Sequence, residues 1–403
     1  MKKILALVLV VVMCIGCFGV LTACNKSEIK VGLICLHDEN STYDNNFIQA
    51  FKAACEAKGL TEKEYAIVTN VPEGTECYNE AVNLAEKGAK AIFADSFGHE
   101  SHMIRAAKEY KDVSFCHATG TSAHTENLPN FYNAFAAIYE GRYLAGVAAG
   151  MKLKELYGGD GVITDEEAVI GYVGAFTYAE VVSGYTSFLL GVQSIVPNAT
   201  MKVKFTGSWY DQKEEANAAQ ALIDDGCKLI SQHADSMGAP STCETAKVPN
   251  VSYNGSTEAS CPETFIVSSK INWQPYFEMM IDNALKGTAI TQDYVGTIAD
   301  GSVQLTALGA AAAQGTAAKL EEVKAALADG SLKVFDTSKF TVGGQPLADN
   351  HKPLAATDGA FADGTVIIKT TEGGVRYFSE SDYRSAPYFD VTIDGITLLN
   401  TKF

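Results

Sequence analysis

Strand-like apolar runs alternate with helix-like patterns over most of the chain, and this alternation constrains the fold more than any other feature. Lys30–Leu36 contains a continuous apolar run, as expected for a parallel strand buried on both faces. Apolar residues then recur at helical spacing from Phe47 to Ala57, and Gly59 ends that pattern. Further strand patterns separated by helical ones occupy residues 65–69, 91–94 and 113–116. This order predicts a doubly wound parallel sheet.

The same alternation begins again after a break. Strand patterns are expected at residues 169–173, 201–205, 228–231, 251–253 and 264–267, with helices at 179–196, 214–224 and 275–284. Parallel sheets bind ligands outside the carboxyl ends of their strands, so two such sheets facing each other would enclose a cleft. The sequence therefore predicts an α/β protein of the type I periplasmic-binding-protein fold, with two doubly wound parallel-sheet lobes around a ligand cleft that closes by hinge motion.

The first 24 residues resemble an export signal of bacterial lipoproteins. Lys2 and Lys3 precede an uncharged, mostly apolar run that ends at Leu21-Thr22-Ala23-Cys24. This ending resembles a lipobox, in which the signal is cleaved before the cysteine and the cysteine is lipidated. We expect lipidation at Cys24 and a location at the cell membrane, lipid-anchored on the extracytoplasmic face. An uncleaved transmembrane anchor is the alternative, because the run is almost long enough to span a bilayer.

The chain is acidic and long enough for more than one domain. Its 403 residues carry a formal charge of −17, which becomes −19 when Lys2 and Lys3 are removed with the signal. A surface of this charge argues against nucleic acid as a partner. Seven cysteines remain after Cys24, without metal-ligand spacing, so no metal or cofactor is expected. A pairing of Cys243 with Cys261 stays open.

The expected domain boundaries follow from these patterns. Glycines interrupt only short apolar runs after about Asp336, which favours small hairpins or an appendage outside the core. The expected divisions are 1–23, a lipoprotein signal peptide; 24–28, a lipidated tether; 29–150, an N-terminal lobe, with part of 270–300 added by a crossover; 151–270, a C-terminal lobe; and 301–403, a crossover segment and a C-terminal β-rich appendage.

An ordered set of short segments resembles the basic membrane protein (BMP) family of ABC-transporter binding lipoproteins. The segments are Ser41–Phe47, Ala94–Gly98, Phe115–Gly120, Tyr139–Gly146, Gly207–Asp211 and Gln232–Ser236. The resemblance extends from about Ile29 to Gly287. It implies capture of a purine base or nucleoside, and delivery to an ABC permease with a cytoplasmic ATPase. The His-Ala-Thr-Gly and Gln-His-x-Asp-Ser elements resemble a branch associated with adenine.

Aromatic residues occupy equivalent places in the two predicted lobes. Tyr43 follows the first strand, and Trp209 follows a strand of the second lobe. A purine has apolar faces and a polar edge, so rings above and below it would suit such a ligand. The resemblance implies that both residues sandwich the base, although Tyr43 could instead pack at a helix start. Trp273 is a weaker candidate for the pocket wall.

Polar candidates follow the strands as well. Asp235 follows strand 228–231, where its carboxylate could accept hydrogen bonds from a purine edge, or could cap a helix instead. Ser96, Phe97 and Gly98 could offer a hydroxyl, an aromatic edge and a backbone N–H. No Gly-x-Ser-x-Gly elbow surrounds Ser96, which argues against a hydrolase.

The resemblance also implies two residues near a sugar. Nucleoside-binding relatives place an aspartate after the strand that matches Val251–Tyr253, and here this place holds Asn254. The family's lysine is matched by Lys270. Because an amide grips a diol less strongly than a carboxylate, Asn254 shifts the expectation toward a free base.

The predicted function is therefore that of a non-enzymatic binding lipoprotein of an ABC importer that captures adenine or a purine nucleoside. No Walker loop is present, so energy must come from a partner. Two alternatives remain open. One is a binding protein for another small polar solute, such as a sugar or an autoinducer, and the other is an extracellular nucleoside-processing enzyme.

Overall fold

The structure is a computed structural model that describes residues 29–402 except 358–360 and 363. The predicted signal peptide, the tether and Cys24 therefore lie outside the described residues. No helix among the described residues is long and apolar enough to cross a membrane.

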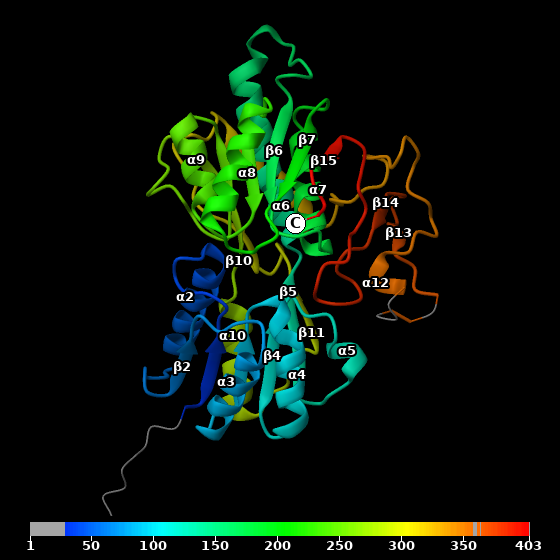
Figure 1. The fold of residues 1–403 in the computed structure, drawn as a ribbon. Coiled ribbons are helices and arrows are strands. Elements are labelled where there is room, and N and C mark those ends of the chain that lie inside the picture. Colours follow the sequence, from blue (N-terminus) through cyan, green and yellow to red (C-terminus); the bar gives the residue numbers. More distant parts are fainter. Residues whose placement is uncertain (1–28, 358–360, 363, 403) are drawn as a thin grey trace, which may run out of the picture.

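The chain folds into two α/β lobes, one above the other in Figure 1, with a C-terminal segment at their side. In lobe I the strand order is β11-β5-β4-β3-β1-β2, and every neighbouring pair is parallel. The strands of this sheet are β1 (Val31–Ile34), β2 (Tyr65–Val68), β3 (Ala91–Ala94), β4 (Ser114–Ala118), β5 (Phe131–Ala136) and β11 (Asp293–Gly296).

Lobe II repeats the architecture with one strand more. Its order is β12-β10-β9-β8-β6-β7-β15, and only the β10–β12 pair is antiparallel. The strands are β6 (Val169–Gly174), β7 (Thr200–Phe205), β8 (Ile230–His233), β9 (Asn250–Tyr253), β10 (Phe265–Ile271), β12 (Val303–Leu305) and β15 (Ile396–Leu398). Two parallel-sheet lobes of this kind are the predicted fold class.

Helices connect the strands of both sheets. The α-helices are α2 (Thr42–Ala57), α3 (Thr75–Glu86), α4 (Glu100–Glu109), α5 (Ala123–Glu126), α6 (Ile138–Tyr157), α7 (Ala179–Gln193), α8 (Gln212–Asp224), α9 (Gly238–Ala246), α10 (Gln274–Lys286), α11 (Thr316–Ala328) and α12 (Leu354–Thr357), with 3₁₀ turns η1 (Phe97–His99) and η2 (Gly158–Asp160). α6 and α7 pack with their backbones close together. A Cβ at Gly146 would lie 2.1 Å from the Phe188 carbonyl, so the crossing requires glycine there.

The chain passes between the lobes three times. It leaves lobe I after β5, returns between β10 and α10, and enters lobe II again between β11 and β12. The predicted lobe boundary at residue 150 falls inside α6, which packs on α7 and β10 of lobe II. The first crossing therefore lies near residue 137, between the end of β5 in lobe I and the start of α6 on lobe II. The return through residues 270–300 matches the expected crossover.

The C-terminal tail, residues 336–403, does more than the sequence predicts. It contains the expected small hairpin, β13 (Ile368–Thr370) with β14 (Arg376–Phe378). However, β15 adds a parallel strand to the edge of lobe II beside β7. Tyr388 and Phe389 are fully buried in the main core. The expectation that the tail lies outside the core is therefore wrong, because its apolar runs are short but find partners far away in the sequence.

The cysteines that follow the tether are buried. Cys243 and Cys261 are both free thiols in the structure, so the pairing left open by the sequence is not formed. Burial raises the pKa of the Cys261 thiol to about 11, which keeps this group protonated at neutral pH. The thiols therefore act as small apolar groups of the core.

Candidate functional site

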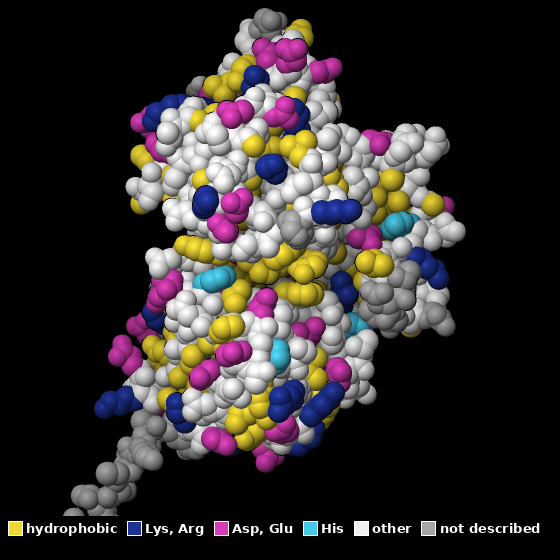
Figure 2. Space-filling view, in the orientation of Figure 1, with side chains coloured by type: hydrophobic (Ala, Val, Ile, Leu, Met, Phe, Trp, Pro, Cys, Tyr) yellow, Lys and Arg dark blue, Asp and Glu magenta, His cyan; other side chains and the backbone are white. Residues whose placement is uncertain are grey.

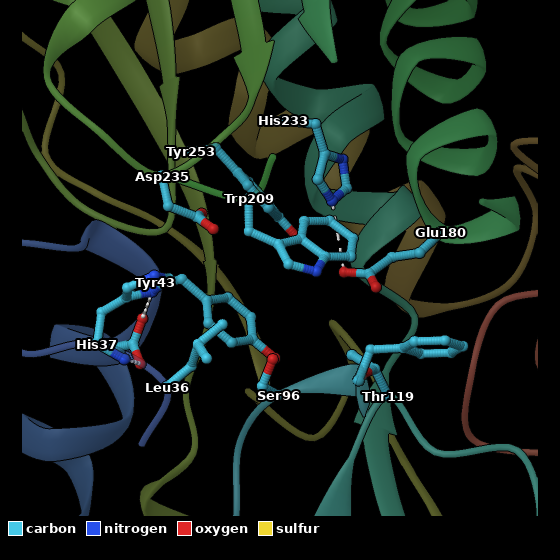
Figure 3. Close-up of a pocket in the computed structure, with 12 residues that line it drawn as sticks. Leu36, His37, Tyr43, Ser96, Thr119, Glu180, Trp209, His233, Asp235 and Tyr253 are labelled. Atoms are coloured by element: carbon cyan, nitrogen blue, oxygen red, sulfur yellow. Dashed lines mark hydrogen bonds and ion pairs between the residues drawn. The ribbon is translucent and has the colours of Figure 1, made fainter. Parts of the chain in front are cut away.

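A cavity lies between the lobes at the carboxyl ends of their parallel strands (Figure 3), and we call it the cleft pocket. Its unfilled space is about 380 Å³, counting the part open to solvent. Residues from both lobes line it: Leu36, His37, Tyr43, Asp44, Ser96, Phe97, Thr119, Glu180, Trp209, His233, Asp235 and Tyr253.

The cleft pocket brings together five of the nine ligand-binding residues expected from the sequence. They are Tyr43, Ser96, Phe97, Trp209 and Asp235. The polar or aromatic groups of Ser96 and Phe97 are engaged with other parts of the protein. The Ser96 hydroxyl donates to a Glu73 carboxylate oxygen at 2.6 Å, and the Phe97 ring stacks on Tyr178 of lobe II at 5.2 Å. The Phe97–Tyr178 pair joins the two lobes, and Figure 2 shows hydrophobic side chains gathered along the seam between them.

The other four expected residues do not line the cleft pocket. The backbone N–H of Gly98 donates to Glu73 at 2.7 Å. Asn254 lies one layer behind the pocket wall. Lys270 faces away from the cleft pocket. Its neighbour on the strand, Ser269, points inward to Arg142, and successive side chains of a strand point to opposite faces of the sheet. Trp273 is 2% exposed and stacks on Phe47 at 4.4 Å, because the chain turns into the core of lobe I there.

Tyr43 stands in the first turn of α2 and is held at both ends. Ser41 caps the helix by accepting from the Asp44 N–H at 3.2 Å. The Tyr43 hydroxyl donates to the Asp95 carbonyl at 2.8 Å, and its ring packs edge-on against Phe47 at 4.8 Å. With the hydroxyl occupied, the ring offers the cleft pocket an apolar face in a fixed orientation.

Trp209 is the aromatic counterpart from lobe II. It lies in the loop after β7, where its indole packs against Phe176 at 5.0 Å and Tyr178 at 6.0 Å. Figure 3 shows Trp209 and Tyr43 approaching the cleft pocket from opposite lobes. A flat ligand between them would have a ring on each side, which is a favourable arrangement for an aromatic heterocycle.

Asp235 is positioned through both its backbone and its side chain. Its N–H donates to the Trp209 carbonyl at 3.0 Å, and its carbonyl accepts from the Thr42 N–H of lobe I at 3.0 Å. The Asn254 amide donates to its carboxyl group at 3.3 Å. The alternative role as a helix cap is not observed, because Met237 occupies the N-cap of α9.

The electrostatic environment of Asp235 favours the neutral, protonated form of its side chain. Burial, followed by the charges of Asp44 and Glu215, raises the pKa of Asp235 well above its usual value. A protonated carboxyl group can donate one hydrogen bond and accept another. The wall of the cleft pocket therefore offers a paired donor and acceptor to a ligand edge.

A histidine and a glutamate form the opposite wall. His233 lies at the end of β8, and its Nε2 is 3.4 Å from Glu180 Oε1 at the start of α7. Burial lowers the pKa of His233, so the ring is neutral near pH 7. In Figure 3, Glu180 and Asp235 lie on opposite sides of the Trp209 indole. The pocket thus has two acidic groups at opposite ends.

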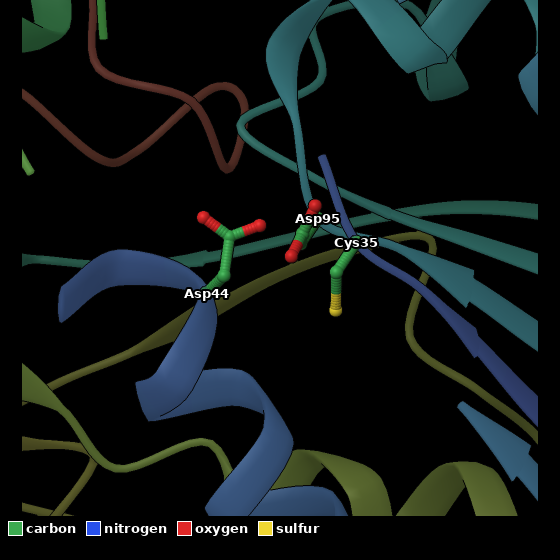
Figure 4. A group of neighbouring side chains, drawn as sticks. All are labelled: Cys35, Asp44 and Asp95. Atoms are coloured by element: carbon green, nitrogen blue, oxygen red, sulfur yellow. The ribbon is translucent and has the colours of Figure 1, made fainter. Parts of the chain in front are cut away.

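A third acidic residue of the pocket lining, Asp44, belongs to a cluster of side chains in lobe I (Figure 4). Cys35, Asp44 and Asp95 have potential ligand atoms within 4.8 Å of one another. Asp44 accepts from the His37 N–H at 2.7 Å and the Ser41 hydroxyl at 2.6 Å, and these hydrogen bonds outweigh burial to lower its pKa. Burial, followed by Asp44, raises the pKa of Asp95 well above its usual value. These contacts give Asp44 a structural role in fixing the start of α2.

Several pocket residues are not predicted from the sequence. Glu180 begins a helix with no distinctive motif, and only the fold brings it to the cleft. His233 is not selected from the sequence as a pocket residue, because its partner Glu180 is 53 residues away. Thr119 lies within the segment Phe115–Gly120 and Tyr253 ends the predicted strand 251–253, so their position at the carboxyl ends of predicted strands is the available signal.

The fold alone is shared with solved binding proteins. A solute-binding protein of an ABC transporter system from Conexibacter woesei superposes with a TM-score of 0.61, at 20% identity, over 76% of this chain and 98% of that one. One from Aeropyrum pernix K1 gives 0.62, at 16% identity, over 76% and 93%. The predicted fold class is confirmed.

Sequence comparison is more specific. Residues 36–339 match the family described as Bmp, ABC transporter substrate-binding protein PnrA-like. The chain belongs to this Bmp family. A purine-binding protein of Brucella abortus is 33% identical over 283 residues, which are 70% of this chain and 75% of that protein.

Membership of the Bmp family settles the general activity. The protein is an extracytoplasmic substrate-binding protein of an ABC transporter, which binds a small ligand and works with a membrane permease. It is not an enzyme, so the nucleoside-processing alternative is removed. The resemblance inferred from the ordered segments is confirmed by this match.

Proposed function

We propose that this Bmp protein captures a purine, either adenine or a purine nucleoside, for import. The observation that carries the proposal is the pair of rings, Tyr43 and Trp209, contributed by opposite lobes beside the buried Asp235. Each ring face that stacks on a base contributes about 1–3 kcal/mol, and either ring alone would bind a purine less firmly. The purine-binding protein of Brucella abortus supports this assignment.

Asp235 suits the edge of an adenine ring. The exocyclic amine of adenine is a donor and lies next to a ring nitrogen that is an acceptor. A protonated carboxyl group matches this pattern, because it accepts from the amine and donates to the nitrogen. The Asn254 amide, which donates to Asp235, would hold the carboxyl in the plane of the ring.

We further propose that Cys24 carries lipid and anchors the protein to the outer face of the cell membrane. The segment that leads to it has the charged start, the apolar run and the small-residue cleavage site of an export signal. The anchor would keep the protein near its permease, and the acidic surface would limit its adhesion to anionic lipid.

The experiment that tests the ligand class is a thermal-shift screen of the soluble domain, residues 29–403, followed by calorimetry. The panel contains adenine, guanine, adenosine, inosine, glucose and ribose. We expect a purine to stabilise the protein, because binding to the native state raises the unfolding temperature. Stabilisation by a sugar without any response to a purine would reject the proposal and favour the sugar-binding alternative.

The anchor is tested with Cys24→Ala in the full-length chain. We expect loss of metabolic labelling with palmitate, because the acylated thiol is absent, and release of the protein or retention of its precursor. Cys35→Ala is the matched control, because this thiol is buried in lobe I and should not affect labelling. Labelling that persists in Cys24→Ala would contradict the lipobox interpretation.

A further inference from the structure

A second cavity adjoins the cleft pocket on the side of Glu180, and we call it the tail chamber. Its unfilled space is about 940 Å³, counting the part open to solvent. Phe97, Thr119 and Glu180 line both cavities, so the two share a wall. The C-terminal tail supplies half of the lining of the chamber: Leu354, Ala355, Arg384, Ala386, Pro387, Tyr388 and Asp390.

Arg384 is the distinctive group of the tail chamber. It is 8% exposed, and its Nε and Nη2 donate to the carbonyls of Ala386 and Pro387 at 3.1 and 2.8 Å. Within the described residues, no carboxylate oxygen lies within 4.0 Å of its guanidinium. The nearby Glu380 is the main opposite charge that acts on Arg384, but burial raises the pKa of Glu380 to about 8, which weakens this compensation near neutral pH. The guanidinium carbon also lies 5.8 Å from the ring centroids of Phe361 and Tyr388. With two of its five N–H groups given to carbonyls, the guanidinium keeps donors for a ligand in the chamber.

The other polar groups of the chamber select among ligands. Glu180 and Asp390 carry carboxylates, which would repel an anion such as a phosphate. Asp390 already accepts from the Leu354 N–H at 2.6 Å, whereas Glu180 has the single 3.4 Å contact with His233 among its described polar contacts. Hydroxyl groups suit this pairing, because they accept from a guanidinium and donate to a carboxylate.

The shared wall contains an unusual backbone. Thr119 has a φ of 60°, a left-handed conformation that is rare for a β-branched residue. Such conformations cost about 1–3 kcal/mol and persist where the surrounding structure enforces them, often beside ligands. Here the strained residue separates the ring-binding cavity from the tail chamber.

We propose that the tail chamber is a subsite for an uncharged, polyhydroxylated substituent of the purine, with Arg384 as its specificity-determining donor. This subsite proposal rests on the proposed purine function and extends it. In it, the lobes bind the purine ring and the tail binds the substituent on that ring. It also locates the substituent on the Glu180 side, away from Asn254. The loss of a carboxylate at Asn254 then no longer argues for a free base.

The test is calorimetric titration of wild type and Arg384→Met with adenine and with adenosine as the hydroxylated probe. We expect Arg384→Met to weaken adenosine about ten- to a hundredfold, as for a lost charge-assisted hydrogen bond, and to leave adenine within about twofold. Arg105→Met is the matched control, because this arginine is on the outer surface of lobe I, where it contacts Glu109 and Tyr78.

A second variant keeps the test decisive if Arg384→Met folds poorly. Ala355→Trp would fill the tail chamber without removing a charge, and should exclude adenosine while adenine still binds. The chamber proposal is wrong if the wild type binds adenosine no more tightly than adenine. It is also wrong if the affinity for adenosine is the same in both variants as in the wild type. In either case the purine function stands. If neither compound binds to the wild type, the proposed function itself fails.

Discussion

The two lobes and the C-terminal tail border the same cleft, but they contribute different chemistry to it. The lobes supply two aromatic rings, Tyr43 and Trp209, and a buried carboxyl group, Asp235, whose pKa is raised above its usual value. The tail supplies a guanidinium, Arg384, among backbone carbonyls and an apolar wall. The lobes lie almost wholly within the family match at residues 36–339, whereas the tail lies almost wholly beyond it.

This difference teaches how one fold can be adapted to a new ligand. The lobes must close on the ligand, so their pocket residues are tied to the sheets and to each other across the cleft. The tail is attached through β15 to the edge of lobe II, where an added strand disturbs no existing pairing. Additional specificity can therefore be built at the side of the cleft without altering the ring-binding residues.

The largest effect is expected at Asp235. Asp235→Ala should weaken adenine and adenosine by the same factor of about ten to a hundred, because it removes two neutral hydrogen bonds to the base edge that contribute about 0.5–1.5 kcal/mol each. Asp235→Asn should lose less, since the amide keeps one acceptor. Calorimetry with both ligands tests this. A loss confined to adenosine would show that Asp235 recognises the substituent, and the division between lobes and tail would be wrong.

The next effect is expected at the stacking rings. Trp209→Ala and Tyr43→Ala should each weaken purine binding about ten- to a hundredfold, because one stacking face contributes roughly 1–3 kcal/mol. Trp209→Phe is the matched control and should retain most of the affinity. Circular dichroism should show an intact fold in each variant. Unchanged affinity in both alanine variants would remove the rings from the site.

The smallest effect is expected where the tail touches lobe I. The Ser385 N–H and hydroxyl donate to Asp293 of β11 at 3.2 and 3.3 Å. Asp293→Ala removes both hydrogen bonds and should therefore favour the open cleft and speed ligand release about two- to tenfold, because long, partly exposed hydrogen bonds contribute at the low end of about 0.5–1.5 kcal/mol. Stopped-flow displacement measures this rate, with the exposed Asp112→Ala as control. An unchanged rate would mean that the tail follows lobe II alone.

Much of the fold could be predicted because its signals are local. Each parallel strand is a short apolar run and each helix has its own spacing, so both lobes are visible in the sequence. The tail is different, because its strand Ile396–Leu398 pairs with β7, which lies almost two hundred residues earlier in the chain. A strand of three residues is also too short to show a recognisable sequence pattern. The first lobe boundary was misplaced because α6 reads as one helix whichever lobe it joins.

The candidate site, like the fold, has residues that local sequence signals predict and residues that they do not. Tyr43, Trp209 and Asp235 follow strands, so the rule that sites lie at carboxyl ends of strands finds them. The rule fails for Trp273, because the chain crosses to lobe I at that point and carries the ring into the core. It also gives no reason to select Glu180 or Arg384, whose positions depend on helix packing and on the path of the tail.

The contrast between the two tryptophans gives the protein a built-in optical reporter. Trp209 borders the cleft pocket, whereas Trp273 is sealed among Phe47, Phe93 and Phe277. These are the only indoles in the chain. Emission from the first should respond when a ligand displaces water, while emission from the second changes only when the core comes apart. Trp273→Phe would leave a single emitter, so that ligand arrival and departure could be followed in real time without any attached dye.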